Sequence, residues 1–129
     1  MSLLVAQICA LNERDSIADV IRSIPRAIPG VDSVTVIVID DGIATGATTR
    51  AALQAIRRRK PKELVLAVPV APPDTIERLR GEVDALICLQ TPESFGAIGY
   101  FYRDFRQVSD EEVVEILKRF PVRGKTSIT

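Results

Sequence analysis

Apolar residues along this chain follow two patterns: short unbroken runs, and positions that recur three or four residues apart. The runs are typical of buried strands, and the wider spacing is typical of amphipathic helices. Strands are expected at residues 3–10, 34–39, 64–70 and 83–89. Helices are expected from Asp15 or Ser16 to residue 24, over 47–59, over 74–79 and after Ser109, where Ser109 and Glu112 form a capping box.

Strands and helices alternate, which predicts an α/β fold with a doubly wound, mainly parallel, Rossmann-like sheet of about four to five strands. Residues 34–39 are almost wholly apolar, so this strand is expected to be covered on both faces. We expect a single domain over residues 1–129, because the chain contains no repeat or linker. The polar residues 122–129 are expected to form a loose tail.

The net charge of the chain indicates which classes of partner it can attract electrostatically. Lys and Arg number 17, and so do Asp and Glu, which leaves a formal net charge of zero. No global field draws such a chain to nucleic acid or to a membrane surface, so neither is expected as a partner. The basic residues 57–60 fall at a predicted helix C-terminus, where cations offset the helix dipole.

Histidine is absent, which excludes Ser-His-Asp and Cys-His catalysis and most zinc sites. Cys9 and Cys88 both stand in apolar runs, and we interpret them as buried small residues rather than a redox pair. No metal-ligating residues are assigned. The N-terminus shows neither a signal-peptide pattern nor a membrane-spanning stretch, so a cytoplasmic location is expected.

The candidate chemistry lies in the turn after the strand at 34–39. Asp40 and Asp41 end that strand, at the sheet edge where α/β folds bind ligands. The phosphate-binding candidates Thr45, Gly46, Ala47, Thr48 and Thr49 then begin a helix. Free N–H groups at such a position favour an anion, and two adjacent carboxylates can accept hydrogen bonds from sugar hydroxyls.

Simpler interpretations of these residues exist. The loop at 40–49 could be only a tight turn whose acids cap a helix, although its length and context favour binding. Asn12 and Glu13 follow the first expected strand, and they either line the same crevice or cap the next helix. The aromatic residues between 95 and 105 either pack as a lid on the sheet or form a stacking platform.

Residues 38–48, Val-Ile-Asp-Asp-Gly-Ile-Ala-Thr-Gly-Ala-Thr, resemble the phosphoribosyl-pyrophosphate signature of type I phosphoribosyltransferases. The likeness extends over about residues 34–120. It implies that Asp40 and Asp41 hold ribose hydroxyls and act as the catalytic pair, and that residues 45–49 bind the 5-phosphate. Residues 95–102, with Phe95 and Tyr100 as candidate lining residues, would lie near the nucleobase or acceptor. Mg²⁺ would be coordinated mainly by pyrophosphate and ribose oxygens rather than by a dedicated set of protein ligands.

The N-terminal third is different. Residues 5–17, Val-Ala-Gln-Ile-Cys-Ala-Leu-Asn-Glu-Arg-Asp-Ser-Ile, followed by the Asp-Asp-Gly at 40–42, resemble the opening of a family-2 glycosyltransferase. That family has a strand ending in a Pro-x-x-Asn-Glu-like turn, and Cys9 stands where its proline usually is. The pyrophosphate loop and hood of a complete phosphoribosyltransferase are not visible. The two likenesses meet at the same turn, which suggests a chimera of the two families.

Three hypotheses follow. The first is a phosphoribosyltransferase-like domain that binds phosphoribosyl pyrophosphate, ribose 5-phosphate or a nucleotide without efficient turnover. The second is a non-enzymatic chimera whose loop is a passive anion site. The third is a nucleotide-sugar binding module. The sequence does not establish the oligomeric state, and a homodimer is one expectation.

Overall fold

A computed structural model of the chain describes residues 19, 21–23 and 28–121. Three parallel strands form one sheet in the order β1-β2-β3, and they are β1 (Thr35–Ile39), β2 (Glu63–Val70) and β3 (Ala85–Gln90). Two helices connect them, α2 (Ala47–Arg57) and α3 (Pro73–Arg80). The predicted α/β fold with a parallel sheet is confirmed. The strand expected at 3–10 and the tail at 122–129 lie outside the described residues, and only residues 19 and 21–23 of the first expected helix are described, all helical.

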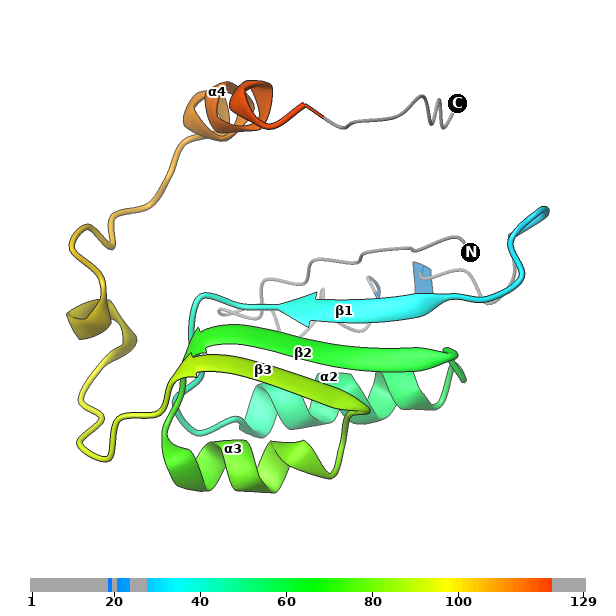
Figure 1. The fold of residues 1–129 in the computed structure, drawn as a ribbon, viewed down its shortest axis with the longest axis horizontal. Coiled ribbons are helices and arrows are strands. Elements are labelled where there is room, and N and C mark those ends of the chain that lie inside the picture. The colour runs from blue at the N-terminus through cyan, green and yellow to red at the C-terminus, as the bar shows by residue number, and fades with distance from the viewer. Residues whose placement is uncertain (1–18, 20, 24–27, 122–129) are drawn as a thin grey trace.

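The core lies between the sheet and the two helices, which cover the same face (Figure 1). Alternate residues of β1 and β2 point to this face, and the deepest are 0–4% exposed: Val36, Val38, Leu64, Leu66 and Val68. From the helices, α2 contributes Leu53 and Ile56, and α3 contributes Ile76 and Leu79. Burying each of these large side chains stabilises the fold by about 1.5–3 kcal/mol, so this layer supplies most of the stability of the described sheet.

The apolar run of β1 predicted cover on both faces, but the face of the sheet away from the two helices is only partly covered. Ile39 at the end of β1 is 37% exposed, and on β3 Ile87 and Leu89 are 54% and 77% exposed. The difference arises because both described crossover helices lie on the other face (Figure 1). On α2, the apolar spacing predicts an inner face of Ala51, Ala52, Ala55 and Ile56. Ala51 is instead exposed, and Leu53 is fully buried.

Ion pairs fasten α2 to the turn before β3. The Arg57 guanidinium lies 2.9 Å from the Asp84 carboxylate, which also accepts the Leu64 N–H at 2.8 Å. These two donors hold the pKa of Asp84 below its ordinary value, the Arg57 hydrogen bond having the larger effect. Part of the basic cluster at 57–60 therefore has a partner inside the fold as well as a favourable place at the helix end.

The C-terminal part leaves the sheet and extends away from it (Figure 1). It contains the short 3₁₀ helix η1 (Ile98–Phe101) and the helix α4 (Asp110–Arg119). The predicted capping box is confirmed, because Ser109 accepts the Glu112 N–H and the Glu112 carboxylate accepts the Ser109 N–H. No residue of α4 is buried. Among the described residues, no helix is long and apolar enough to cross a membrane.

Candidate ligand-binding site at the carboxyl ends of the strands

The loop between β1 and α2 is attached to the neighbouring strand by backbone hydrogen bonds. The Asp40 N–H donates to the Ala67 carbonyl at 3.4 Å, and the Ile43 N–H donates to the Val70 carbonyl at 3.1 Å. Ile43 is also buried in the core. Both ends of the Asp-Asp-Gly turn are therefore held at the sheet edge where parallel α/β folds bind their ligands.

Gly46 is the residue on which the start of α2 depends. It is the N-cap, with φ of 76°, in the left-handed region that side chains disfavour. A Cβ there would also lie 2.9 Å from Cγ2 of Thr75 and 3.4 Å from Cδ1 of Leu79. Only glycine satisfies both the backbone conformation and the close approach of α3.

The first turn of α2 presents free backbone donors. The Arg50 N–H is bonded to the Gly46 carbonyl at 2.8 Å, so the N–H groups of Ala47, Thr48 and Thr49 precede the helical ladder. Gly46 offers no side chain to cap them, and the first turn contains no acid. An anion at this point would meet three N–H groups and the positive end of the helix dipole.

The three residues that carry these donors line a cavity of about 200 Å³. The residues that line it are consecutive in sequence except for one: residues 40–49, together with Ile98. Ile98 lies over Gly42, since a Cβ on that glycine would meet Cγ2 of Ile98 at 2.7 Å. Gly42 therefore leaves room for an apolar wall that η1 places beside the two acids.

Thr75, on α3, contacts the loop between β1 and α2. It is 1% exposed, and its hydroxyl donates to the Ala44 carbonyl at 2.8 Å while accepting from the Arg78 guanidinium at 3.3 Å. Its methyl group lies against Gly46. One buried side chain thus fixes the backbone on both sides of Thr45.

Asp40 and Asp41 differ in their surroundings. Asp40 is half-buried and Asp41 is exposed. Burial raises the pKa of Asp40 to about 6, and the hydrogen bond and the charge of Asp41 also raise it. Asp40 Oδ1 accepts the Asp41 N–H at 2.8 Å, which orients its carboxyl group. The site therefore carries a carboxyl group whose charge changes not far below neutral pH.

The aromatic segment closes one side of the site. The Tyr102 hydroxyl donates to the Asp41 carbonyl at 2.5 Å, and its ring lies 4.9 Å from that of Phe105. Burial and the nearby acids raise the pKa of Tyr102 above its ordinary value, so this hydroxyl keeps its proton at neutral pH. Beside it is a second cavity of about 180 Å³, mostly apolar, lined by Pro69, Val70, Leu89, Gln90, Phe101 and Tyr102.

The structure brings most of the predicted site residues together. Asp40, Asp41 and residues 45–49 line one cavity, although the Thr49 side chain itself is buried. Phe95 stacks on Phe101 with ring centroids 5.2 Å apart, and Tyr100 is 81% exposed; neither lines the two cavities. Asn12 and Glu13 lie outside the described residues.

Thr75 was not predicted as a site residue, and Ile98 and Tyr102 were expected near the acceptor only as part of residues 95–102. Thr75 lies 31 residues from its partner Ala44, and Tyr102 lies 61 residues from Asp41. One signal was present for Ile98, because it stands between two glycines in a segment already expected to lie near the ligand. In the part of the chain that the structure describes, no three His, Cys, Asp or Glu residues gather as a metal site.

Comparison with known proteins assigns the same region to one family. A model of the phosphoribosyl transferase domain matches residues 5–106, on both sides of the Asp-Asp-Gly turn. Two Mycobacterium tuberculosis proteins, from strains CDC 1551 / Oshkosh and ATCC 25618 / H37Rv, are each 49% identical to this chain over 83 residues. Their names are "Putative phosphoribosyl transferase MT0597" and "Putative phosphoribosyl transferase Rv0571c". The match covers 64% of this chain and 19% of each relative.

A solved structure, that of TT1426 from Thermus thermophilus, superimposes with a TM-score of 0.58 at 36% sequence identity. The superposition covers 81% of this chain and 50% of that one. The chain thus spans about a fifth of the length of the two mycobacterial relatives and half of the Thermus chain. The family match begins at residue 5, so it includes the segment that resembles a glycosyltransferase; no comparison shows that second likeness or a chimera.

Proposed function

Because the chain belongs to the phosphoribosyl transferase domain family, we propose that residues 40–49 bind the ribose 5-phosphate part of a small molecule. Phosphoribosyl pyrophosphate, ribose 5-phosphate and a nucleotide all carry that part. The observation that supports this most is the cavity in which an uncapped helix N-terminus and two adjacent carboxyl groups face the same space.

The phosphate would lie at the start of α2. The N–H groups of Ala47, Thr48 and Thr49 and the Thr45 and Thr48 hydroxyls provide donors, and both hydroxyls are on exposed residues lining the cavity. The cavity contains no Lys or Arg among the described residues. Backbone donors and the helix dipole would therefore supply the attraction, as in other helix-terminus phosphate sites.

The ribose would lie between the two acids and Ile98. Ionised Asp40 and Asp41 accept hydrogen bonds only, so they suit the two ribose hydroxyls. Ile98 provides an apolar surface for a face of the sugar ring. The adjacent apolar cavity, with Phe101 and Tyr102 on its lining, is the place for a nucleobase or other planar acceptor.

In a complete enzyme of this family, the bond from ribose C1 to pyrophosphate would break as a bond to a nitrogen nucleophile forms. Pyrophosphate would leave with the bonding electrons, and the nucleophile would lose a proton to solvent. The carboxylates would stabilise the positive charge that develops on the ribosyl group. Asp40 and Asp41 carry the carboxylate oxygens that would be available to Mg²⁺, whose charge would offset that of the leaving pyrophosphate.

We expect this chain to bind the ribose 5-phosphate group but to catalyse the transfer reaction poorly. The described lining offers donors for one phosphate but no cationic side chain for a pyrophosphate. A pyrophosphate-release assay with phosphoribosyl pyrophosphate and common nucleobases should therefore show little activity. Turnover at an ordinary enzymatic rate, with kcat of about 10 per second, would contradict this expectation.

Titration calorimetry tests the binding proposal. Ribose 5-phosphate should bind more tightly than either inorganic phosphate or ribose, because it uses both halves of the site. The Asp40→Asn, Asp41→Asn double variant should lose the preference for ribose 5-phosphate but keep affinity for phosphate. Asp74→Asn, an exposed acid in the first turn of α3, is the matched control. Equal affinity of the parent chain for phosphate and ribose 5-phosphate would refute the ribose site.

The nucleotide-sugar module and the passive chimera stay alternatives to this proposal. The same titration separates them. Preference for a nucleoside diphosphate sugar, sensitive to Asn12 and Glu13, would favour the nucleotide-sugar module. Absence of any phosphate-dependent stabilisation would favour a passive scaffold.

A further inference from the structure

Helix α4 carries an apolar stripe that the described chain leaves uncovered. The large apolar residues of the helix and of its C-cap, Phe120, are 43–74% exposed: Val113, Val114, Ile116, Leu117 and Phe120. At 100° per residue these five occupy an arc of about 160° on one side of the helix. Continuous exposed apolar surface of this kind marks an interaction site rather than an ordinary solvated face.

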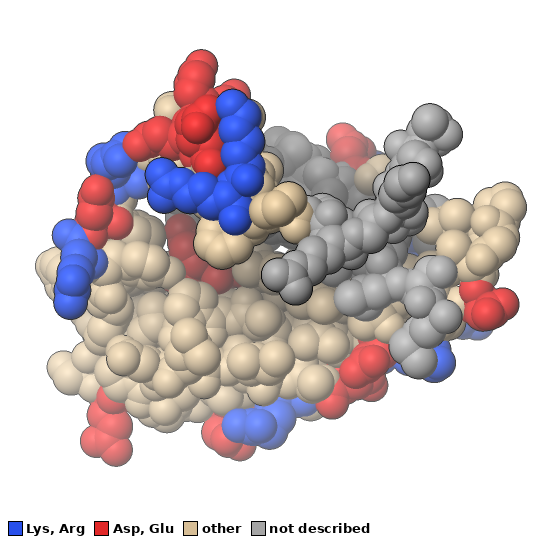
Figure 2. All heavy atoms as spheres, turned by 45° about the horizontal axis from the view of Figure 1, so that its top comes forward, with Lys and Arg blue, Asp and Glu red and all other residues tan. Residues whose placement is uncertain are grey.

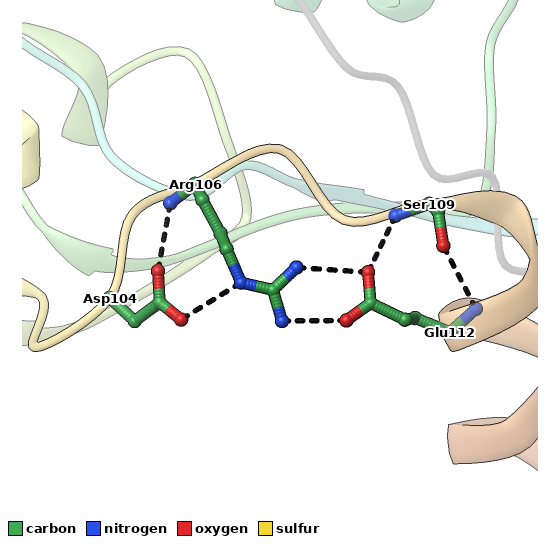
Figure 3. A network of polar contacts seen from close by, with 4 residues as sticks. All are labelled: Asp104, Arg106, Ser109 and Glu112. Atoms are coloured by element: carbon green, nitrogen blue, oxygen red, sulfur yellow. Dashed lines mark hydrogen bonds and ion pairs between the residues drawn. The ribbon is translucent and has the colours of Figure 1, made fainter.

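The helix is held in shape by contacts at its N-terminus (Figure 3). Arg106 donates to both Glu112 oxygens, at 2.6 and 3.0 Å, and to Asp104 at 3.0 Å. Glu112 completes the capping box with Ser109, and Arg106 together with this backbone donor lowers the pKa of Glu112 to about 2. Arg106 and the capping box therefore stabilise the start of the helix that carries the apolar stripe.

The charges beside the stripe are arranged so that a second copy of the same helix fits them. Residues seven apart on a helix lie within about 20° of one another, so Glu111 and Lys118 share one flank and Glu112 and Arg119 share the other. On each flank the acid is near the N-terminus and the base near the C-terminus. Acidic and basic side chains are interspersed on the projecting C-terminal part (Figure 2). This polarity is complementary to itself only when a second helix runs in the opposite direction.

We propose that α4 is a self-association surface, on which the stripe packs antiparallel against α4 of a second copy of this chain. A two-fold axis then sets Glu111 opposite the second copy's Lys118, and Lys118 opposite the second copy's Glu111. To within one residue, the same register places Val113 opposite the second copy's Leu117, near the centre line of the stripe. In this one antiparallel alignment of the two helices, the apolar stripes are in contact and each flank sets an acid opposite a base.

The Glu111 and Lys118 flank is the more selective of the two. Glu112 is already engaged by Arg106, whereas Glu111 is exposed. Lys118 lies 2.7 Å from Glu115 within its own helix, but both side chains are about two-thirds exposed, so that pair is weak and exchangeable. A parallel arrangement would instead set Glu111 level with the second copy's Glu111, and like charges would oppose it.

The expected dimer is weak. Two short helices of this length bury less than the roughly 1,600 Å² of a standard stable interface. Phe105 and Val108, exposed to 46% and 47% just before α4, can enlarge the contact. Association should therefore be visible as a concentration-dependent equilibrium in the micromolar to millimolar range.

Sedimentation equilibrium of the whole chain, up to about 1 mM, tests the surface. Leu117→Asp should weaken dimerisation at least about tenfold, since it places a charge in the apolar contact. Lys62→Glu reverses the charge of an exposed residue just before β2, distant in sequence from α4, and should leave dimerisation unchanged. A parent chain that stays monomeric, or a Leu117→Asp variant that dimerises like the parent, would overturn the proposal.

Charge exchange tests the antiparallel register. Glu111→Lys and Lys118→Glu should each weaken the dimer roughly three- to tenfold, and the double exchange should restore it. An equimolar mixture of the two single variants should form a mixed dimer more stable than either variant alone. Circular dichroism checks that each variant keeps α4. Failure of the double variant to recover, or of the mixture to associate, would contradict the register.

Discussion

Residues 35–90 and residues 91–121 are stabilised in different ways. In the first region, two helices bury strand side chains to exposures of 0–4%, and three strands pair in parallel register. In the second, no helix residue is buried, and order comes from a capping box, an arginine between two acids and ring contacts. The first region is therefore expected to determine folding, whereas the second shapes the surroundings of the ligand and the surface offered to partners.

The two regions meet at the candidate site. The first contributes the loop with its acids and helix N-terminus, and the second contributes Ile98 over Gly42 and the Tyr102 hydroxyl on the Asp41 carbonyl. A site built from a rigid loop and a less buried cover can keep its phosphate donors fixed while the cover adjusts to the ligand. Changes in the first region should therefore cost stability, and changes in the second should mainly alter binding.

The largest expected effect is on core packing. Leu53→Ala removes a fully buried side chain from α2 and should lower the free energy of unfolding by about 2–5 kcal/mol. Leu117→Ala on α4 should change it by less than about 0.5 kcal/mol at low protein concentration. Urea unfolding of both variants measures the difference. Equal losses would mean that α4 is packed as firmly as α2, which would contradict the comparison.

Gly46→Ala should have the next largest effect. The positive φ and the approach of Thr75 both oppose a Cβ, so we expect a loss of about 1–3 kcal/mol together with lost phosphate binding. Gly81→Ala is the matched control, because its φ of −74° suits alanine and no atom of the described chain lies within 4 Å of the added Cβ. That change should be neutral or stabilising by about 0.4–1 kcal/mol. Thermal unfolding with and without phosphate distinguishes them.

Thr75→Val should act on the loop more than on the fold. Valine keeps the methyl contact with Gly46 but removes the donor to the Ala44 carbonyl, which costs about 1 kcal/mol. Affinity for inorganic phosphate should fall several-fold because the loop loses its support. Thr91→Val, at an exposed position, is the control. Unchanged phosphate affinity in a folded Thr75→Val protein would show that this hydroxyl does not position the loop.

Much of the first region was predictable from sequence, because burial imposes a readable pattern. The strands expected at 34–39 and 64–70 occur at 35–39 and 63–70, and the helix expected from residue 47 begins there. The inward position predicted for Ala51 on α2 was wrong, because the larger Leu53 takes the buried position and the apolar spacing allowed either.

The cover of the site was less predictable. The contacts of Thr75 with Ala44, and of Tyr102 with Asp41, join residues far apart in sequence. They depend on how α3 and the aromatic segment are placed, which local pattern does not specify. In the same way the capping box of α4 was visible in the sequence, whereas its lack of cover was not. The assignments of Asp40, Asp41 and residues 45–49 to a ligand stay predictions.

The smallest expected effect is on pH dependence. Burial raises the folded-state pKa of Asp40 to about 6, so its favourable contribution to stability is present below its unfolded value and is lost as pH rises through about 6. Ribose binding should follow the opposite course and strengthen over the same rise, because the ionised carboxylate accepts hydroxyl hydrogen bonds. Calorimetry from about pH 5 to about pH 8 checks both. The phosphate group titrates in the same pH range, and its effect is removed by subtracting the pH profile measured for the Asp40→Asn variant. If the parent chain and this variant gave identical pH profiles, the role of Asp40 would be contradicted.

The central claim is that the backbone donors opening α2 hold a phosphate. Amide chemical shifts of the ¹⁵N-labelled chain, followed during addition of ribose 5-phosphate, test this directly. We predict that the largest shifts fall on Ala47, Thr48 and Thr49, that inorganic phosphate reproduces them, and that ribose alone does not. Saturating ribose 5-phosphate that leaves these three amides unmoved, or moves others instead, would contradict the account.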